Sequence, residues 1–171
     1  MVVSSLFEAW SSRRSPDKLN QSSREQDWAS SMKLEFHHIN FVADDVDRLH
    51  DFYTKVLKLD DIPQDNFPRT KATEELGYTG KIRFATEGKM QMHLAEREFD
   101  VAFKNKQVIN PVERGHIAFR TDDLDAFLRI LDENDIPYSD YGTAFSKAWH
   151  QVFFMDPEGN VIEVHQQVLE I

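Results

Sequence analysis

The chain contains no cysteine, which excludes disulfide bonds, thiolate metal ligands and a cysteine nucleophile. Basic residues are also few, 20 against 30 acidic ones, and the net charge of −10 would repel nucleic-acid phosphates and anionic membranes. No apolar run approaches the roughly 20 residues that a membrane-spanning helix needs. We therefore expect neither nucleic acid nor a membrane as a partner, and we expect a cytoplasmic location.

A ten-residue segment occurs twice. Residues 38–47 (HINFVADDVD) recur 78 residues later as residues 116–125 (HIAFRTDDLD), with six identical positions. Apolar and polar side chains alternate in each copy, as is typical of a strand, and the aspartates that follow are suited to cap a helix. The repeat therefore predicts two similar half-modules, each of which begins with a histidine on a strand.

The rest of each half is expected to contain two or three strands joined by tight turns. We divide the chain into an N-terminal extension that is flexible or a short helix, a first module, a linker and a second module, with these bounds: 1–31, 32–98, 99–113 and 114–171. Two sheets that are each covered by a helix on one face would place their uncovered faces together as a cup. The sequence thus predicts an α+β fold.

Four potential metal ligands occupy equivalent positions in the two halves. His38 and His116 begin the first strands, and an alignment at an offset of 70 places His93 opposite Glu163 on the last strands. Three imidazoles and one carboxylate suit Zn, Ni, Fe or Mn, and the pattern does not choose between these ions. By strand alternation, His37 should point away from His38.

Other side chains of the second half are candidates for contacting the substrate or for orienting a metal ligand. Arg120 has the same strand parity as His116, and His165 lies two positions beyond Glu163 on the same face. His150 and Gln151 open another strand. We predict Arg120, His150 and His165 as substrate-contacting residues.

Three segments of the chain resemble the vicinal oxygen chelate superfamily, which includes glyoxalases, bleomycin-resistance proteins and extradiol dioxygenases. These segments are residues 38–45 with Phe52 and Tyr53, residues 115–123, and residues 156–163. The resemblance covers residues 34–168. It implies two tandem βαβββ modules that form a cup-shaped mixed sheet with the helices outside. It also implies one divalent metal ion in the cup with open positions for two substrate oxygens, bound by His38, His93, His116 and Glu163.

Glyoxalase-like members isomerise a hemithioacetal, and a carboxylate equivalent to Glu163 moves the proton. The resemblance therefore implies a lyase or isomerase similar to lactoylglutathione lyase, which acts on a small oxygen-chelating substrate and uses Glu163 and His93 as catalytic residues. The common bacterial glyoxalase pattern has a carboxylate at the position of His93. With Glu163 alone, a divalent ion would keep one positive charge and act as a stronger Lewis acid toward anionic oxygens.

Alternatives remain open. His38, His116 and Glu163 alone form the ligand set of a non-haem Fe(II) dioxygenase, with His93 as an acid or base. A thiol transferase of the fosfomycin-resistance kind ranks third, and a non-catalytic resistance or ligand-binding protein of the same fold is the remaining class. Residues 64–80 and 139–149, which would select the substrate, carry no recognisable signature. We also expect a homodimer, because a symmetric partner usually covers the apolar edge or rim of so small a sheet.

Overall fold

The computed structural model describes residues 32–66 and 78–170 and has an α+β fold. The N-terminal extension expected over residues 1–31 lies outside the described residues. The first half contains β1 (Leu34–Ala43), α3 (Val46–Asp51), the π-helical turn η2 (Phe52–Val56), β2 (Asp60–Ile62), the 3-10 turn η3 (Gln64–Asn66), β3 (Ile82–Thr86) and β4 (Gln91–Glu96). The second half contains β5 (His116–Thr121), α6 (Leu124–Glu133), β6 (Tyr138–Gly142), β7 (Trp149–Met155) and β8 (Val161–Gln167). Between them lies the short helix α5 (Val101–Lys104).

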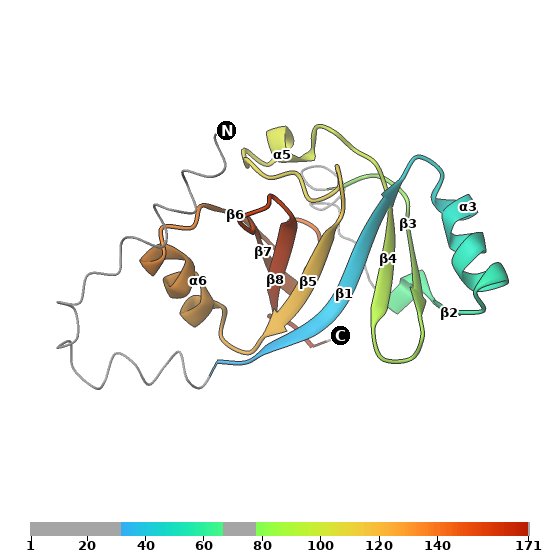
Figure 1. Cartoon of the computed structure of the whole chain (residues 1–171), viewed down its shortest axis with the longest axis horizontal. Coiled ribbons are helices and arrows are strands. Elements are labelled where there is room, and N and C mark those ends of the chain that lie inside the picture. Colours follow the sequence, from blue (N-terminus) through green and yellow to red (C-terminus); the bar gives the residue numbers. More distant parts are fainter. Residues whose placement is uncertain (1–31, 67–77, 171) are drawn as a thin grey trace.

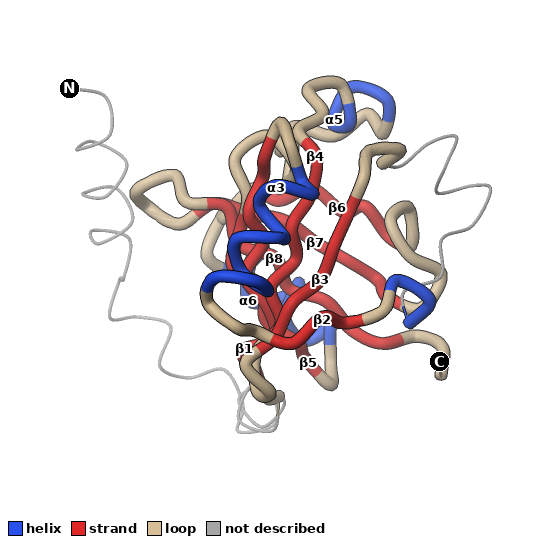
Figure 2. The backbone as a smooth tube through the Cα atoms, turned by 90° about the vertical axis from the view of Figure 1, so that its right-hand side faces the viewer, coloured by secondary structure: helices blue, strands red, loops and turns tan. Residues whose placement is uncertain are grey.

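The strands form one mixed sheet in the order β2-β3-β4-β1-β5-β8-β7-β6. At its centre β1 and β5 run antiparallel, while β4 lies parallel to β1 and β8 lies parallel to β5. Each half therefore repeats the same strand, helix and three-strand arrangement, and the predicted α+β fold with two βαβββ modules is confirmed. Helices α3 and α6 lie at opposite ends of the sheet in Figure 1, and the strands curve in the view of Figure 2.

Helices α3 and α6 begin directly after the aspartates that were predicted to cap them. Asp45 accepts a hydrogen bond from the backbone N–H of Arg48, and Asp123 accepts one from Ala126. Both carboxylates thus satisfy N–H groups that have no partner within the helix.

The apolar side chains of the first helix do not all lie on one face. Val46 is buried, but after α3 the chain passes into the π-helical turn η2, and Phe52, Val56 and Leu57 are about half exposed or more. A π turn contains more residues than an α turn, so later side chains rotate away from the face that Val46 uses. In the second half, Leu124, Phe127 and Leu131 of α6 remain on one face and pack with Val152 and Val164 of the sheet.

Strand β1 contains a β-bulge. Its register with β5 pairs Phe36 with Phe119 but His38 with Ala118, which leaves His37 as an extra residue. A bulge bends the strand and redirects the side chains around it. This irregularity lies directly before His38, the first of the predicted metal ligands.

Within residues 32–66 and 78–170, no helix has the length and apolar character needed to cross a lipid bilayer.

Candidate metal centre

A cavity of about 120 Å³ opens between the two halves. Tyr78, Phe84, Phe145, Trp149 and Phe153 supply aromatic walls. Its polar lining includes five imidazoles and one carboxylate, from His37, His38, His93, His116, His165 and Glu163. Among the described residues that line it there is no Lys or Arg. The cavity therefore combines apolar walls with a polar cluster that holds one acidic group.

Three of the predicted ligands converge from three neighbouring strands. The Nε2 atoms of His38 on β1 and His116 on β5 are 3.3 Å apart. Oε2 of Glu163 on β8 lies 3.0 Å from Nε2 of His116 and 3.7 Å from Nε2 of His38. All three side chains are buried. Their three ligand atoms lie within 4.8 Å of one another and could hold a metal ion.

The spacing of these three atoms fits a metal ion. With ligand bonds of about 2.0–2.2 Å, neighbouring ligand atoms around an ion are about 3.0–3.5 Å apart. The distances of 3.3 Å and 3.0 Å lie within this range, and the distance of 3.7 Å between His38 and Glu163 slightly exceeds it. Nδ1 of His116 lies 3.0 Å from the carbonyl oxygen of Pro111. Because a carbonyl only accepts, Nδ1 carries the proton and the lone pair of Nε2 faces Glu163. A hydrogen bond of this kind commonly orients a metal-binding histidine.

The charge of the cluster also favours a cation. Burial lowers the pKa of His38 well below 6.5, and the neighbouring His93 lowers it further. Burial alone would raise the pKa of Glu163, but the imidazoles around it, including the hydrogen bond that Nδ1 of His165 donates, hold it well below 4.5. The carboxylate is thus ionised beside a neutral His38. A buried negative charge without a compensating cation is costly, and a divalent ion would supply that compensation.

His93 occupies the position that the repeat predicts but lies apart from this group of three. Asn40 of β1 pairs with His93, and Ala118 of β5 pairs with Glu163, so His93 and Glu163 are equivalent within their halves. The His93 ring is stacked on that of His38, with centroids 3.7 Å apart and planes 14° apart. Its Nε2 lies 3.0 Å from Oε1 of Gln91. The side chain therefore lines the cavity without joining either of the two ligand groups that the described residues form.

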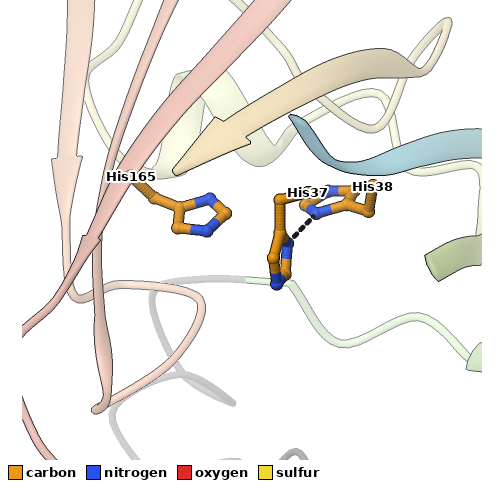
Figure 3. A group of neighbouring side chains, drawn as sticks. All are labelled: His37, His38 and His165. Atoms are coloured by element: carbon orange, nitrogen blue, oxygen red, sulfur yellow. Dashed lines mark hydrogen bonds between the residues drawn. The ribbon is translucent and has the colours of Figure 1, made fainter. Parts of the chain in front are cut away.

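The expectation that His37 points away from His38 is wrong. Nδ1 of His37 is 2.9 Å from Nδ1 of His38, and the His37 ring lines the cavity. In Figure 3 the ring of His165 extends toward the ring of His37, and the two ring centroids are 4.6 Å apart. The physical reason is the bulge in β1, which breaks the alternation of the side chains at this residue. The alternation of apolar and polar residues does not distinguish a bulged strand from a regular one.

Arg120 fixes the positions of the protons in this chain of hydrogen bonds. Its Nη2 lies 2.6 Å from Nε2 of His37. Because a guanidinium only donates, Nε2 of His37 accepts and a neutral His37 carries its proton on Nδ1. That proton is donated to Nδ1 of His38, so a neutral His38 carries its own proton on Nε2, toward His116 and Glu163. A metal ion in this position would have to displace that proton.

A second group of possible ligands consists of His37, His38 and His165 (Figure 3). It contains no carboxylate, and both ring nitrogens of His37 already have hydrogen-bond partners. The positive charge of Arg120 also lies against it. This group is therefore less suited to a cation than His38, His116 and Glu163.

The second oxygen of Glu163 orients two side chains of the same sheet face. Oε1 lies 2.6 Å from Nδ1 of His165 and accepts a 3.1 Å hydrogen bond from Nε2 of Gln151. Gln151 and His165 are directly paired between β7 and β8. Glu163 thus offers one oxygen to the candidate metal position and uses the other to hold its neighbours.

Of the predicted substrate residues, His165 lines the cavity, whereas its described lining includes neither Arg120 nor His150. The guanidinium carbon of Arg120 lies 4.5 Å from the centre of the Trp149 ring. Arg120 therefore packs against a residue of the cavity lining without lining the cavity itself. His150 lies 2.7 Å from a carboxylate oxygen of Asp140 and is partly exposed.

Comparisons with known proteins agree with this geometry. The profile of the family described as "Glyoxalase/Bleomycin resistance protein/Dioxygenase superfamily" matches residues 35–164. No curated protein matches the chain.

Several solved structures share the fold. A hypothetical protein from Bacillus halodurans C-125 has a TM-score of 0.56 at 16% identity, over 81% of this chain and 98% of that one. Methylmalonyl-CoA epimerase from Mycobacterium tuberculosis has a TM-score of 0.55 at 17% identity, over 78% and 88%. A Streptomyces coelicolor methylmalonyl-CoA epimerase variant in complex with 2-nitronate-propionyl-CoA has a TM-score of 0.52 at 20% identity, over 78% and 97%. At these identities the likeness concerns the fold.

Proposed function

Because this chain belongs to the glyoxalase, bleomycin resistance protein and dioxygenase superfamily, we propose that it is a divalent-metal-dependent lyase or isomerase. Its substrate is a small oxygen chelator, and the reaction proceeds through stabilisation of an enolate. The observation that carries the proposal is the convergence of His38, His116 and Glu163 on one point of the cavity. We assign Zn, Ni, Fe or Mn as the ion, since mixed nitrogen and oxygen ligands suit each of them.

Each part of the cavity has a role in this proposal. His38, His116 and Glu163 hold the ion, with His93 as a fourth ligand once its hydrogen bond to Gln91 is released. When bound, the ion supplies a Lewis acid that lowers the energy of negative charge on the substrate oxygens. The aromatic walls exclude water and thereby strengthen electrostatic interactions inside the cavity.

Proton transfer is assigned to Glu163, with His93 as the second candidate. The hydrogen bonds from Gln151 and His165 hold the Glu163 carboxylate in one orientation. A fixed orientation favours proton transfer, because a general base must lie within hydrogen-bond reach of the proton that it moves. His93 lies against the ring of His38 and lines the same cavity.

The metal site is tested by elemental analysis of the purified protein and of His116→Ala and Glu163→Ala. We expect about one ion per chain in the wild-type protein and none in either variant. His50→Ala and Glu158→Ala are matched controls outside the cavity lining and should keep the ion. Metal retained in both site variants would contradict the proposed ligands.

The reaction class is tested with the metal-loaded protein in deuterated water. A panel of small α-hydroxy carbonyl compounds and hemithioacetals would be followed by proton NMR for exchange of the carbon-bound hydrogen next to the carbonyl group. We expect exchange that depends on the metal and is lost in Glu163→Gln. A folded, metal-loaded protein that exchanges no member of the panel would count against enolate chemistry.

A second candidate function is an Fe(II)-dependent dioxygenase. The specific observation in its favour is that two imidazoles and one carboxylate form the ligand group while His93 lies outside it. This is the ligand set of non-haem iron oxygenases. Anaerobic reconstitution with Fe(II), followed by oxygen uptake with a panel of catechols, separates this function from the first. Uptake without carbon-hydrogen exchange would favour the dioxygenase.

A further inference from the structure

We propose that this site selects oxygen chelators that also present a hydrogen-bond donor, a hydroxyl or an N–H group, to Oε1 of Gln151 and Nε2 of His165. This inference rests on the proposed function, because it names the class of ligand for the same cavity. It follows from the way in which Glu163 orients these two neighbours.

The amide of Gln151 can adopt only one orientation beside an ionised Glu163. Its side chain lies 3.1 Å from Oε1 of Glu163, and a carboxylate only accepts hydrogen bonds. The NH2 group of Gln151 must therefore face Glu163. The carbonyl oxygen of the amide is turned the other way, and it is buried with no hydrogen-bond partner among the described residues.

The ring of His165 is oriented by the same carboxylate oxygen. Its Nδ1 lies 2.6 Å from Oε1 of Glu163, so Nδ1 carries the proton that makes this contact. In the neutral ring, Nε2 then presents a lone pair. This atom is also buried, and no described residue donates a hydrogen bond to it. Oε1 of Glu163 thus orients both side chains so that Oε1 of Gln151 and Nε2 of His165 are left as hydrogen-bond acceptors.

The two residues that carry these acceptors are adjacent in the sheet. Gln151 and His165 face each other across β7 and β8 and both line the cavity. A buried acceptor without a partner costs about 1–3 kcal/mol, which is comparable to losing a full hydrogen bond. A ligand that donates to either atom removes this cost. A ligand that places a methyl group there leaves the acceptor buried and unpaired.

The rest of the lining restricts the ligand further. No Lys or Arg is among the described lining residues, so the metal ion is the cation available to anionic oxygens of the ligand. The cavity is small, about 120 Å³, and its walls are largely aromatic. The ligand class is therefore a compact chelator with two oxygens for the metal and an adjacent hydroxyl or N–H group.

Acetohydroxamate and N-methylacetohydroxamate test this inference on the unmodified protein. Both chelate a metal through the same two oxygens, and they differ in that a methyl group replaces the N–H. Binding of each to the zinc-loaded protein is measured by titration calorimetry, and zinc content is determined on the same samples. We expect the N–H compound to bind roughly tenfold more tightly, the equivalent of one buried hydrogen bond.

A variant identifies the acceptor responsible. Gln151→Met removes the carbonyl acceptor at similar volume and should reduce the ratio of the two affinities toward one. Gln167→Met is the matched control, because the same substitution is made at an exposed glutamine of β8 outside the cavity lining. It should preserve the wild-type ratio.

The outcomes separate the two proposals. Equal affinities in a protein that holds one zinc per chain would overturn the donor requirement and leave the metal site intact. An unchanged ratio in a folded, zinc-loaded Gln151→Met would overturn the assignment of Gln151 and leave Nε2 of His165 as the acceptor. A chain that binds no zinc would overturn the proposed function and this inference together.

Discussion

Nε2 of His116 lies 3.0 Å from Oε2 of Glu163, and both side chains are buried. The two residues come from adjacent parallel strands, so the sheet itself brings them together. A lone pair and a carboxylate oxygen that face one buried point are arranged for a cation.

The first prediction concerns Glu163→Gln, which keeps the volume of the side chain but removes its charge. At a metal concentration about 100 times the dissociation constant, binding should stabilise the wild-type protein by about 2.7 kcal/mol. For a chain of this size, that corresponds to a rise in Tm of roughly 5–10 °C. The variant should show no rise, because a neutral amide is a poor ligand for a divalent ion. Differential scanning calorimetry with and without Zn²⁺ measures both proteins, and an equal shift in the two would contradict the role given to Glu163.

The second prediction concerns acid. Burial lowers the pKa of both His37 and His93 to about 3, and it lowers the pKa of His38 well below 6.5. Because the unfolded chain titrates near 6.5, it binds more protons than the folded protein between these values. Stability is therefore complete above about pH 6.5 and falls as the pH falls toward 3. Each of the three groups should cost about 1.4 kcal/mol at pH 5.5, so the metal-free protein should lose about 4 kcal/mol between pH 7.5 and 5.5.

Urea unfolding at the two pH values measures this loss. His37→Asn removes one of the three titrating groups and should reduce the drop by about a third. A free energy of unfolding that is the same at both pH values would show that these imidazoles are not buried in their neutral form.

The repeat and the strand alternation predict most of the fold and part of the site. Duplicated histidines and aligned last strands placed His38, His116 and Glu163 on one face, because β-strand geometry depends on parity that a sequence displays directly. His37 was misplaced because one extra residue in β1 reverses that parity. The orientation of Gln151 depends on a contact between two strands, and no pattern within a single strand encodes it.

The third prediction concerns Arg120, which holds the proton of His38 on Nε2 through His37. Arg120→Gln would let His37 carry its proton on Nε2 and accept from Nδ1 of His38, leaving Nε2 of His38 open to the metal. It would also remove a positive charge near the ion. Metal affinity should therefore rise, by up to about tenfold, the size of effect typical of groups that orient metal ligands.

Competition with a chromophoric chelator measures the affinity. Arg120→Lys keeps the positive charge and a donor, and it should remain close to the wild-type protein. A decrease in affinity in Arg120→Gln would contradict the assignment of the protons along the chain.

The fourth prediction concerns Gly115, which precedes His116 and has a φ of 90°. A Cβ atom at this position would collide with the backbone oxygen of Asn40. Gly115→Ala should cost about 2–5 kcal/mol, from backbone strain and from the displacement of β1 or β5. Gly88 has a φ of 102°, and apart from its chain neighbours no described residue has an atom within 4 Å of the position that its Cβ would take, so Gly88→Ala should cost only the strain, about 1–2 kcal/mol. Equal losses in urea unfolding would show that the close approach to Asn40 carries no cost.

The last prediction concerns the outer face of the two central strands. Leu34, Phe36 and Ile117 are 46%, 50% and 38% exposed, and the register of β1 with β5 places them on the face that carries Phe119. In Figure 1 helices α3 and α6 lie to either side of these strands. A contiguous apolar surface of this kind usually marks an interface, and a symmetric pair of chains would cover it. We therefore expect a homodimer of about 40 kDa, twice the 20.0 kDa of the chain.

Light scattering at low micromolar concentration gives the mass directly. Phe36→Asp places a charge on the exposed face, away from the cavity lining, and should convert the dimer into a monomer of about 20 kDa that still binds metal. Loss of metal together with the dimer would mean that the partner chain completes the site. A wild-type mass of one chain would rule out the dimer, and the exposed phenylalanine would then have to be explained by another partner or by the residues outside the described ranges.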